Sequence, residues 1–178
     1  MLKNVPLAVL VVIAVSTSLF AQQDKSKRPS PPAQAKCQFS DGKTITVDYS
    51  SPRVKGRKIF GDLVPFGEVW RTGANEATTF VTTGGVTANG RDIPAGSYTL
   101  FTVPEESKWT LIVNKKTGEW GIPYHYESDE LARIPMSVAK TSSPVEEFNI
   151  SFDQGGDTCT MKIRWEQTEA SIPFSQKK

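Results

Sequence analysis

The chain has 178 residues, of which 38% are hydrophobic and 22% are charged, so it is long enough for one domain with a sizeable core. Its formal net charge is +2, but after Lys36 it carries 16 Lys and Arg residues against 18 Asp and Glu residues. A near-neutral domain argues against a nucleic-acid-binding protein, which would show a dominant basic face, so we expect no nucleic-acid partner.

Residues 1–21 have the pattern of a secretory signal peptide. Lys3 supplies a positive charge, Val5–Ala14 form an apolar run, and Ala21 is a small residue at the expected cleavage point. The run is shorter than the ~20 residues that a membrane-spanning helix needs. We therefore favour cleavage over an uncleaved anchor, with cleavage after Ser18 as the alternative site. The expected product is exported, periplasmic or extracellular, with no membrane span.

Residues 22–36 are rich in Pro, Ser, Lys and Gln and have no apolar periodicity. Such a segment buries too little apolar surface to offset the entropy lost on ordering. It is predicted to be a disordered, basic tether. The folded domain is then expected over residues 37–174, with a short tail at residues 175–178.

The two cysteines are expected to form a disulfide. Cys37 shares strand parity with Phe39, and Cys159 shares it with Met161, so both side chains point to the apolar faces of their strands. An even number of cysteines in an exported protein also favours a bridge. The alternative is a pair of buried free thiols. With one histidine and no CxxC motif, no metal site and no cofactor are predicted.

Period-two alternation of apolar and polar residues recurs along the domain and predicts β-strands. Turn-forming pairs such as Asn89-Gly90 and Gly155-Gly156 separate the strands. The pattern indicates an all-β domain: a single antiparallel β-sandwich or flattened barrel, jelly-roll-like, with little helix. One helical turn is possible at Asp129–Arg133. The predicted strands cover residues 45–49, 98–103, 109–113, 148–152 and 159–165.

The first hairpin can be predicted in more detail. A three-residue loop, Asp41-Gly42-Lys43, keeps the apolar faces of its two strands together, whereas a two-residue loop mixes them. This loop pairs Phe39 with Ile45 and Cys37 with Val47.

The run from Val54 to Thr78 is unusually dense in charge, amide and glycine for a β protein. Unpaired polar groups cost stability inside a fold, so this run is the first place to look for a site. Arg57 and Lys58 belong to a basic strip. The strip is interpreted either as a sheet-edge device against unwanted pairing or as a site for a carboxylate, sulfate or phosphate.

The sharpest element of this run is Arg71-Thr72-Gly73-Ala74-Asn75-Glu76. Gly73 and Asn75 favour a tight turn. One interpretation is an internal clamp in which Arg71 pairs with Glu76, with Thr72 and Asn75 satisfying the remaining donors. The other is the floor of a polar pocket, with Arg71 holding an anion and Glu76 as a weak candidate for a catalytic acid or base.

These residues carry a family resemblance. The run VKGRKIFGDLVPFGEVWRTGANEAT, followed by IPAGSYTLFTVP, KWTLIVNK and EWG with a nearby YHY, resembles the exported bacterial domain-of-unknown-function family 2911. The resemblance extends from about Ser40 to Pro173. It implies an exported single-domain β protein and brings no established catalytic residues.

An aromatic loop follows the predicted strand at residues 109–113. Trp120, Tyr124 and Tyr126 are interpreted either as a stacking platform for a sugar ring or proline-rich peptide, or as a cap on the end of the core. His125 lies beside acidic residues, but a solvated acidic loop is preferred to a metal site.

The favoured hypothesis is a non-catalytic binding or structural module of the cell envelope, whose partner is a glycan, a small anion or an envelope protein. The alternative is an envelope hydrolase of a glycan or similar polymer that uses Glu76. The two hypotheses differ in whether Glu76 lies fully buried against Arg71 with no adjoining cleft, or opens into a pocket with a second carboxylate or His125.

Overall fold

The computed structural model of the chain describes residues 24–177, so the predicted signal peptide lies outside the described part. Within it, strands dominate and helix is limited to short 3-10 turns. The elements are η1 (Lys25–Lys27), β1 (Pro32–Gln38), β2 (Thr44–Ser50), β3 (Thr78–Thr82), β4 (Val86–Ala88), β5 (Arg91–Ile93), β6 (Gly96–Pro104), β7 (Trp109–Asn114), η2 (Glu127–Asp129), β8 (Glu130–Gly155) and β9 (Thr158–Gln176).

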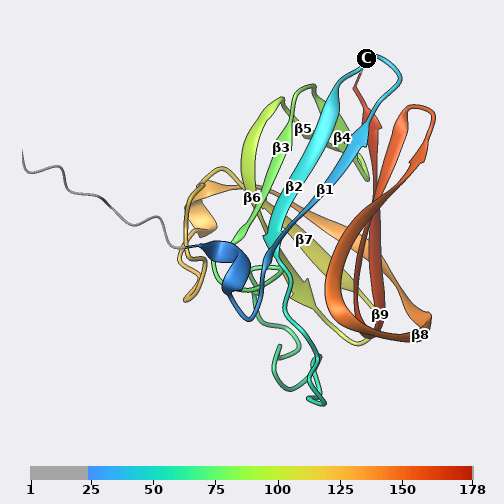
Figure 1. Cartoon of the computed structure of the whole chain (residues 1–178). Helices are drawn as coiled ribbons and strands as arrows, with labels where there is room; N and C mark the ends of the chain where they lie inside the picture. The colour runs from blue at the N-terminus through green and yellow to red at the C-terminus, as the bar shows by residue number, and fades with distance from the viewer. Residues whose placement is uncertain (1–23, 178) are drawn as a thin grey trace, which may run out of the picture.

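The described strands form one antiparallel sheet in the order β1-β2-β3-β6-β7-β8-β9-β4-β5. This confirms the all-β, sandwich-like prediction, and the sheet is not closed into a barrel. The long strand β8 pairs with β7 through its first residues and with β9 through the rest. The sheet therefore folds over itself around one core, which brings its edge strand β1 against β8 (Figure 1).

The alternating patterns produce this core directly. Ile45 and Val47 of β2 are fully buried, and their neighbours Thr44 and Thr46 are only partly buried. Strand β6 is buried on both faces from Tyr98 to Thr102, and the buried run includes the polar residues Thr99 and Thr102. Aromatic rings fill one end of the core in mostly edge-to-face contacts: Phe60, Trp70, Trp109, Phe148 and Trp165.

The predicted cysteine pair is confirmed. Cys37 of β1 and Cys159 of β9 are joined by a disulfide, with their Cα atoms 6.1 Å apart. Both residues are buried. The bridge ties an edge strand of one layer to the opposite layer across 122 residues of sequence.

The first hairpin has the predicted face but not the predicted register. Cys37 pairs with Ile45, and the loop consists of Ser40, Asp41 and Gly42, closed by a bond from the Phe39 N–H to the Lys43 carbonyl. Gly42 has φ +85°, which is the conformation that this type of three-residue loop requires. The predicted and the observed loops put the same side chains on the same face, so the alternation of faces alone cannot distinguish the two registers.

The segment expected to be a tether differs most from its prediction. Strand β1 already begins at Pro32, where the sequence pattern predicted disorder to Lys36. The apolar residues here, Ala33 and Ala35, are small, which hides the alternation, yet Ala35 is buried. At the other end of the chain, β9 extends to Gln176, into the expected tail. The helical turn expected at Asp129–Arg133 is also replaced, by η2 and the start of β8.

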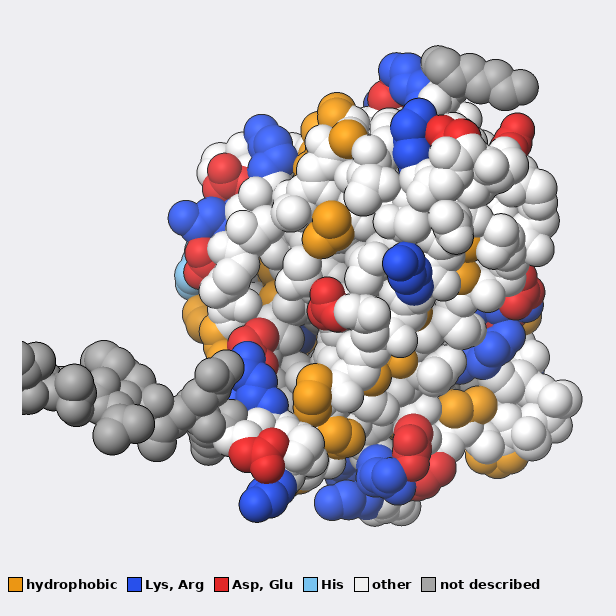
Figure 2. All heavy atoms as spheres, turned by 45° about the horizontal axis from the view of Figure 1, so that its top comes forward, with side chains coloured by type: hydrophobic (Ala, Val, Ile, Leu, Met, Phe, Trp, Pro, Cys, Tyr) orange, Lys and Arg blue, Asp and Glu red, His pale blue; other side chains and the backbone are white. Residues whose placement is uncertain are grey.

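The surface carries both signs of charge. On the face shown in Figure 2, Lys and Arg side chains lie interspersed with Asp and Glu side chains. In the described residues, no helix has the length and apolar character needed to cross a membrane.

Candidate functional site

The connection between β2 and β3 carries the candidate site and extends beyond one end of the sheet (teal to green in Figure 1). It is anchored at Trp70, whose backbone exchanges two hydrogen bonds with Thr102 of β6, at 2.8 and 2.9 Å. The basic strip lies in this connection as turns with one isolated bridge at Arg53, so it is not the edge strand that one interpretation required.

Thr72 is part of the scaffold. It is fully buried, and its hydroxyl donates to the Trp70 carbonyl at 3.3 Å and contacts the Thr102 hydroxyl at 3.1 Å. Its own carbonyl accepts from the Thr78 hydroxyl at 2.7 Å. These hydrogen bonds satisfy the polar groups of Thr72 within the protein, so Thr72 is no longer a candidate ligand-binding residue.

Asn75 holds the N-terminal segment. Its φ of 58° is one that Asn tolerates better than most residues. Its Nδ2 atom donates to the Ser30 carbonyl at 3.0 Å. Next to this contact, the Ser51 N–H donates to the Pro31 carbonyl at 2.9 Å. The segment expected to be free is therefore bonded to the Arg71–Glu76 turn and to the end of β2.

Glu76 binds cations of the same N-terminal segment. Arg28 Nη1 lies 2.9 Å from Glu76 Oε2, and Lys25 Nζ lies 3.0 Å from Oε1. The pKa of the Glu76 carboxyl falls to about 2, first because its own backbone N–H donates to it and then because Lys25 and Arg28 do. Glu76 is thus held ionised.

The interpretation of Arg71 and Glu76 as an internal clamp is wrong. Among residues 24–177, no hydrogen bond or ion pair joins the two side chains, because Arg28 and Lys25 occupy the Glu76 carboxylate. The Arg71 guanidinium lies 5.0 Å from the centre of the Trp120 ring, and its Nη1 donates to the Trp120 carbonyl at 3.4 Å.

Gly121 makes this arrangement possible. It has φ +91°, and a Cβ atom there would lie 2.8 Å from the Ala77 side chain and 3.2 Å from the Arg71 Cβ. Glycine therefore lets the loop come close enough for Trp120 to cover Arg71. Burial lowers the pKa of the Arg71 guanidinium, and the negative charge of Glu76 partly opposes this shift.

Arg57 and Arg71 line the same hollow, of about 380 Å³. Arg57 is fixed by two backbone carbonyls, with Nε 3.0 Å from the Val54 oxygen and Nη2 2.6 Å from the Arg53 oxygen. Trp70 and Trp165 form part of the hollow's wall, and Ser30 lies at its border. The structure thus brings two of the predicted residues together.

A second hollow, of about 560 Å³, adjoins the first. We call the two together the Trp70 groove, because both are lined by Leu63, Val64, Trp70 and Ile122. Leu63 and Ile122 are 47% and 44% exposed, and they are two of the four large hydrophobic side chains that stand exposed within residues 24–177. The far hollow also contains Glu68, Glu127 and Tyr124.

The aromatic loop does not form one open platform. The Tyr124 hydroxyl donates to Glu130 Oε1 at 2.7 Å, and the rings of Tyr124 and Tyr126 pack on Phe101. Burial, and then the bond to Glu130, raise the pKa of Tyr124. Tyr124 and Tyr126 therefore mainly cap a small second core, while Trp120 is 53% exposed.

His125, in the same loop, is exposed. In the described part of the chain, no group of three or more His, Cys, Asp and Glu side chains is placed to hold a metal ion.

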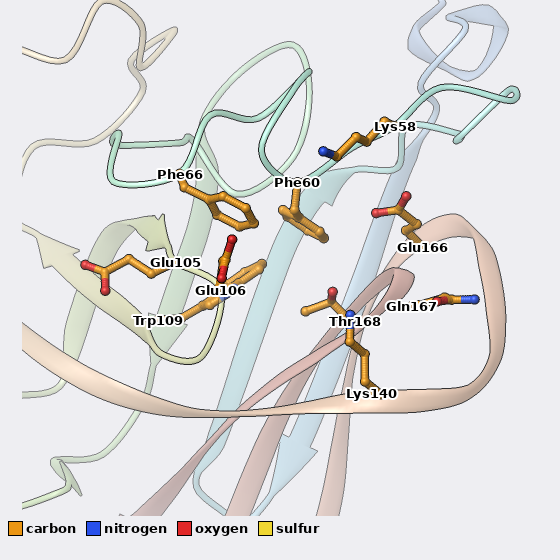
Figure 3. Close-up of a pocket in the computed structure, with 10 residues that line it drawn as sticks. All are labelled: Lys58, Phe60, Phe66, Glu105, Glu106, Trp109, Lys140, Glu166, Gln167 and Thr168. Atoms are coloured by element: carbon orange, nitrogen blue, oxygen red, sulfur yellow. The ribbon is translucent and has the colours of Figure 1, made fainter.

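Lys58 lies in a separate hollow of about 430 Å³ on another side of the connection. Figure 3 shows Lys58 above Phe60, with the Glu106 carboxylate between Phe66 and Trp109. Neighbouring residues Arg57 and Lys58 thus serve different surfaces, and the basic strip does not act as one anion site. The other lining residues are Glu105, Lys140, Glu166, Gln167 and Thr168.

A family model supports the resemblance seen in the sequence. The model, described as a protein of unknown function (DUF2911), matches residues 30–174. The chain belongs to the DUF2911 family. Comparison with curated proteins and comparison with solved structures gave no match.

The DUF2911 match begins at Ser30, earlier than the resemblance in sequence suggested, and so includes β1 and the backbone to which Asn75 binds. Lys25 and Arg28, which bind Glu76, precede the match. Sequence reasoning missed both of these residues, because nothing in a basic, proline-rich run distinguishes a docked cation from a solvated one. It also missed Leu63 and Ile122, although each stands close to a proline in a loop, where an exposed apolar residue is informative.

Proposed function

We propose that this protein is an exported, non-catalytic binding module of the cell envelope that holds a small amphipathic ligand in the Trp70 groove. The observation that carries the proposal is the pair of adjoining hollows that share Leu63, Val64, Trp70 and Ile122. Concave, mostly apolar sites of a few hundred Å³ with a few polar groups are typical of small-molecule binding.

Export is supported by the signal-like residues 1–21 and by the disulfide between Cys37 and Cys159. Disulfides persist in oxidising compartments and are rare in the cytosol.

The state of Glu76 argues against a role for this residue as a general acid. A general acid needs to hold its proton near neutral pH, whereas Glu76 has a pKa of about 2 and binds two cations.

The binding proposal is tested with a neutral fluorescent probe, N-phenyl-1-naphthylamine. We expect saturable binding to the mature protein, weakened at least ~10-fold by Leu63→Asp and by Ile122→Asp, because a carboxylate in the groove must be desolvated. Both residues are partly exposed, so both variants are expected to fold. Phe66→Asp is the matched control, because Phe66 is 39% exposed but lines the Lys58 hollow instead. Equal binding by all four proteins, or no binding, overturns the proposal.

A second candidate is an envelope hydrolase of a glycan or similar polymer. It is favoured by one observation: the hollow of about 180 Å³ beside Glu76 also contains Asp48, so two carboxylates border one space. The assay is release of reducing ends from purified peptidoglycan, compared with Glu76→Gln. Release that disappears in the variant supports hydrolysis; no release, or equal release by both proteins, overturns it.

A further inference from the structure

Two arginines of the Trp70 groove have no acidic partner. Within residues 24–177, neither Arg57 nor Arg71 takes part in a salt bridge. This is unlike most arginines of the chain. Arg91 is simply exposed on an edge strand. The others each pair with a glutamate: Arg28 with Glu76, Arg53 with Glu147, Arg133 with Glu130 and Arg164 with Glu169.

For Arg71, the structure explains why no acidic side chain forms a salt bridge with it. Its nearest candidate, Glu76, is held by Lys25 and Arg28. Arg71 is partly buried, yet its guanidinium, which has five N–H donors, makes one long bond of 3.4 Å, to the Trp120 carbonyl. A partly desolvated cation without a salt-bridge partner costs stability, and a bound anion would offset that cost.

Arg57 is oriented in a similar way. Its Nε and Nη2 atoms donate to the Val54 and Arg53 carbonyls, so the side chain is fixed while Nη1 stays available. Arg57 and Arg71 line one hollow. Two guanidinium groups around one space match the oxygens of a carboxylate, sulfate or phosphate monoester, which they bind through paired hydrogen bonds.

The other residues that line the groove indicate the chemistry of the rest of the ligand. From the arginines the surface continues over Trp70, Val64 and Ile122, which are apolar. At the far end stand Glu68 and Glu127, which would repel a second negative charge. The groove therefore presents cations at one end, apolar side chains in the middle and carboxylates at the other end.

We infer that the ligand of the Trp70 groove is a single-headed anionic amphiphile, whose oxyanion head lies between Arg57 and Arg71 and whose apolar body lies along Trp70 and Ile122. This inference rests on the proposed function, because it names the ligand class of the same groove.

The test measures displacement of N-phenyl-1-naphthylamine by ten-carbon probes below their micelle concentrations: decanoate, decyl sulfate, decyl phosphate, 1-decanol and decyltrimethylammonium. We expect at least one oxyanion probe to bind ~10-fold or more tightly than 1-decanol and the cationic probe. The order of affinity among the three oxyanion probes identifies the head group that the groove prefers. Arg71→Gln and Arg57→Gln are each expected to weaken the preferred oxyanion by ~10- to 100-fold, as for a hydrogen bond to a charged group, and to leave 1-decanol unchanged.

Arg91→Gln is the matched control and should change no affinity. Arg57 is on the surface, so its variant keeps the test valid should Arg71→Gln fail to fold. Equal binding of decanoate, decyl sulfate, decyl phosphate and 1-decanol, unaffected by either arginine variant, overturns the head-group inference and leaves the proposed function standing. No displacement by any probe, together with no binding of the fluorescent reporter, overturns both.

Discussion

Removing the disulfide between Cys37 and Cys159 should cost this protein much of its stability. The bridge closes a loop of 122 residues in the unfolded chain. In the chain-entropy model a loop of this length is worth about 5 kcal/mol, as an upper value. Most domains are stable by about 5–15 kcal/mol in total. For a domain of this size the loss corresponds to a fall in Tm of roughly 10–20 °C.

The assay is urea unfolding of the protein at pH 7, followed by tryptophan fluorescence. A Cys37→Ala, Cys159→Ala double variant is compared with the oxidised wild type and with the wild type in a reductant. We expect the reduced wild type and the double variant to agree, and the reductant to leave the double variant unchanged. A stability difference below about 1 kcal/mol between the oxidised protein and the variant would refute the reasoning.

Other predictions concern the loop and the core. Glu76→Gln should destabilise the protein by less than about 1 kcal/mol at pH 7, because the Glu76 side chain is 41% exposed. The pKa of Glu76 in the folded protein, about 2, lies below the ordinary glutamate value of 4.5. In urea unfolding at each pH, the stability difference between the two proteins should therefore be present above pH 4.5 and vanish as the pH falls through 2; a stability difference that persists at pH 2 contradicts the ion-pair explanation. Asn75→Gly should cost about 1 kcal/mol for the lost bond to Ser30, and Asn75→Ala about 1–2 kcal/mol more because of its positive φ; equal costs in thermal unfolding would contradict this. Phe148→Ala should cost about 3–5 kcal/mol, since its ring is buried among Tyr49, Trp70 and Trp165; a loss under 1 kcal/mol would show that the aromatic cluster collapses around the gap.

The sequence predicts those features that depend only on which face of a strand a residue occupies. The buried face of β2 follows from alternation, because each side chain has only two sides to choose from. Alternation also places Cys37 and Cys159, the two cysteines of the sequence, on the apolar faces of their strands, where they pair. The register of the first hairpin does not follow from alternation, since shifting it by two residues keeps every face. Loop geometry at Gly42 decides it.

The candidate site depends on contacts that alternation does not encode. Arg71 and Glu76 are five residues apart, which made their pairing the natural expectation. Glu76 instead binds Arg28, 48 residues earlier in the chain. A partner so distant in sequence can be identified only from the folded structure. As a consequence, Arg71 forms no salt bridge within residues 24–177, and the proposed anionic head group of the ligand follows from this observation.

Strand β8 has a consequence for how a ligand can enter. Its first residues belong to the layer of β7 and the rest to the layer of β9, so one continuous backbone runs through both. The disulfide from β1 to β9 fastens the layers a second time. These two covalent connections restrain movement of one layer relative to the other. We therefore expect the groove to open through its two loops, the one that carries Leu63 and the one that carries Ile122.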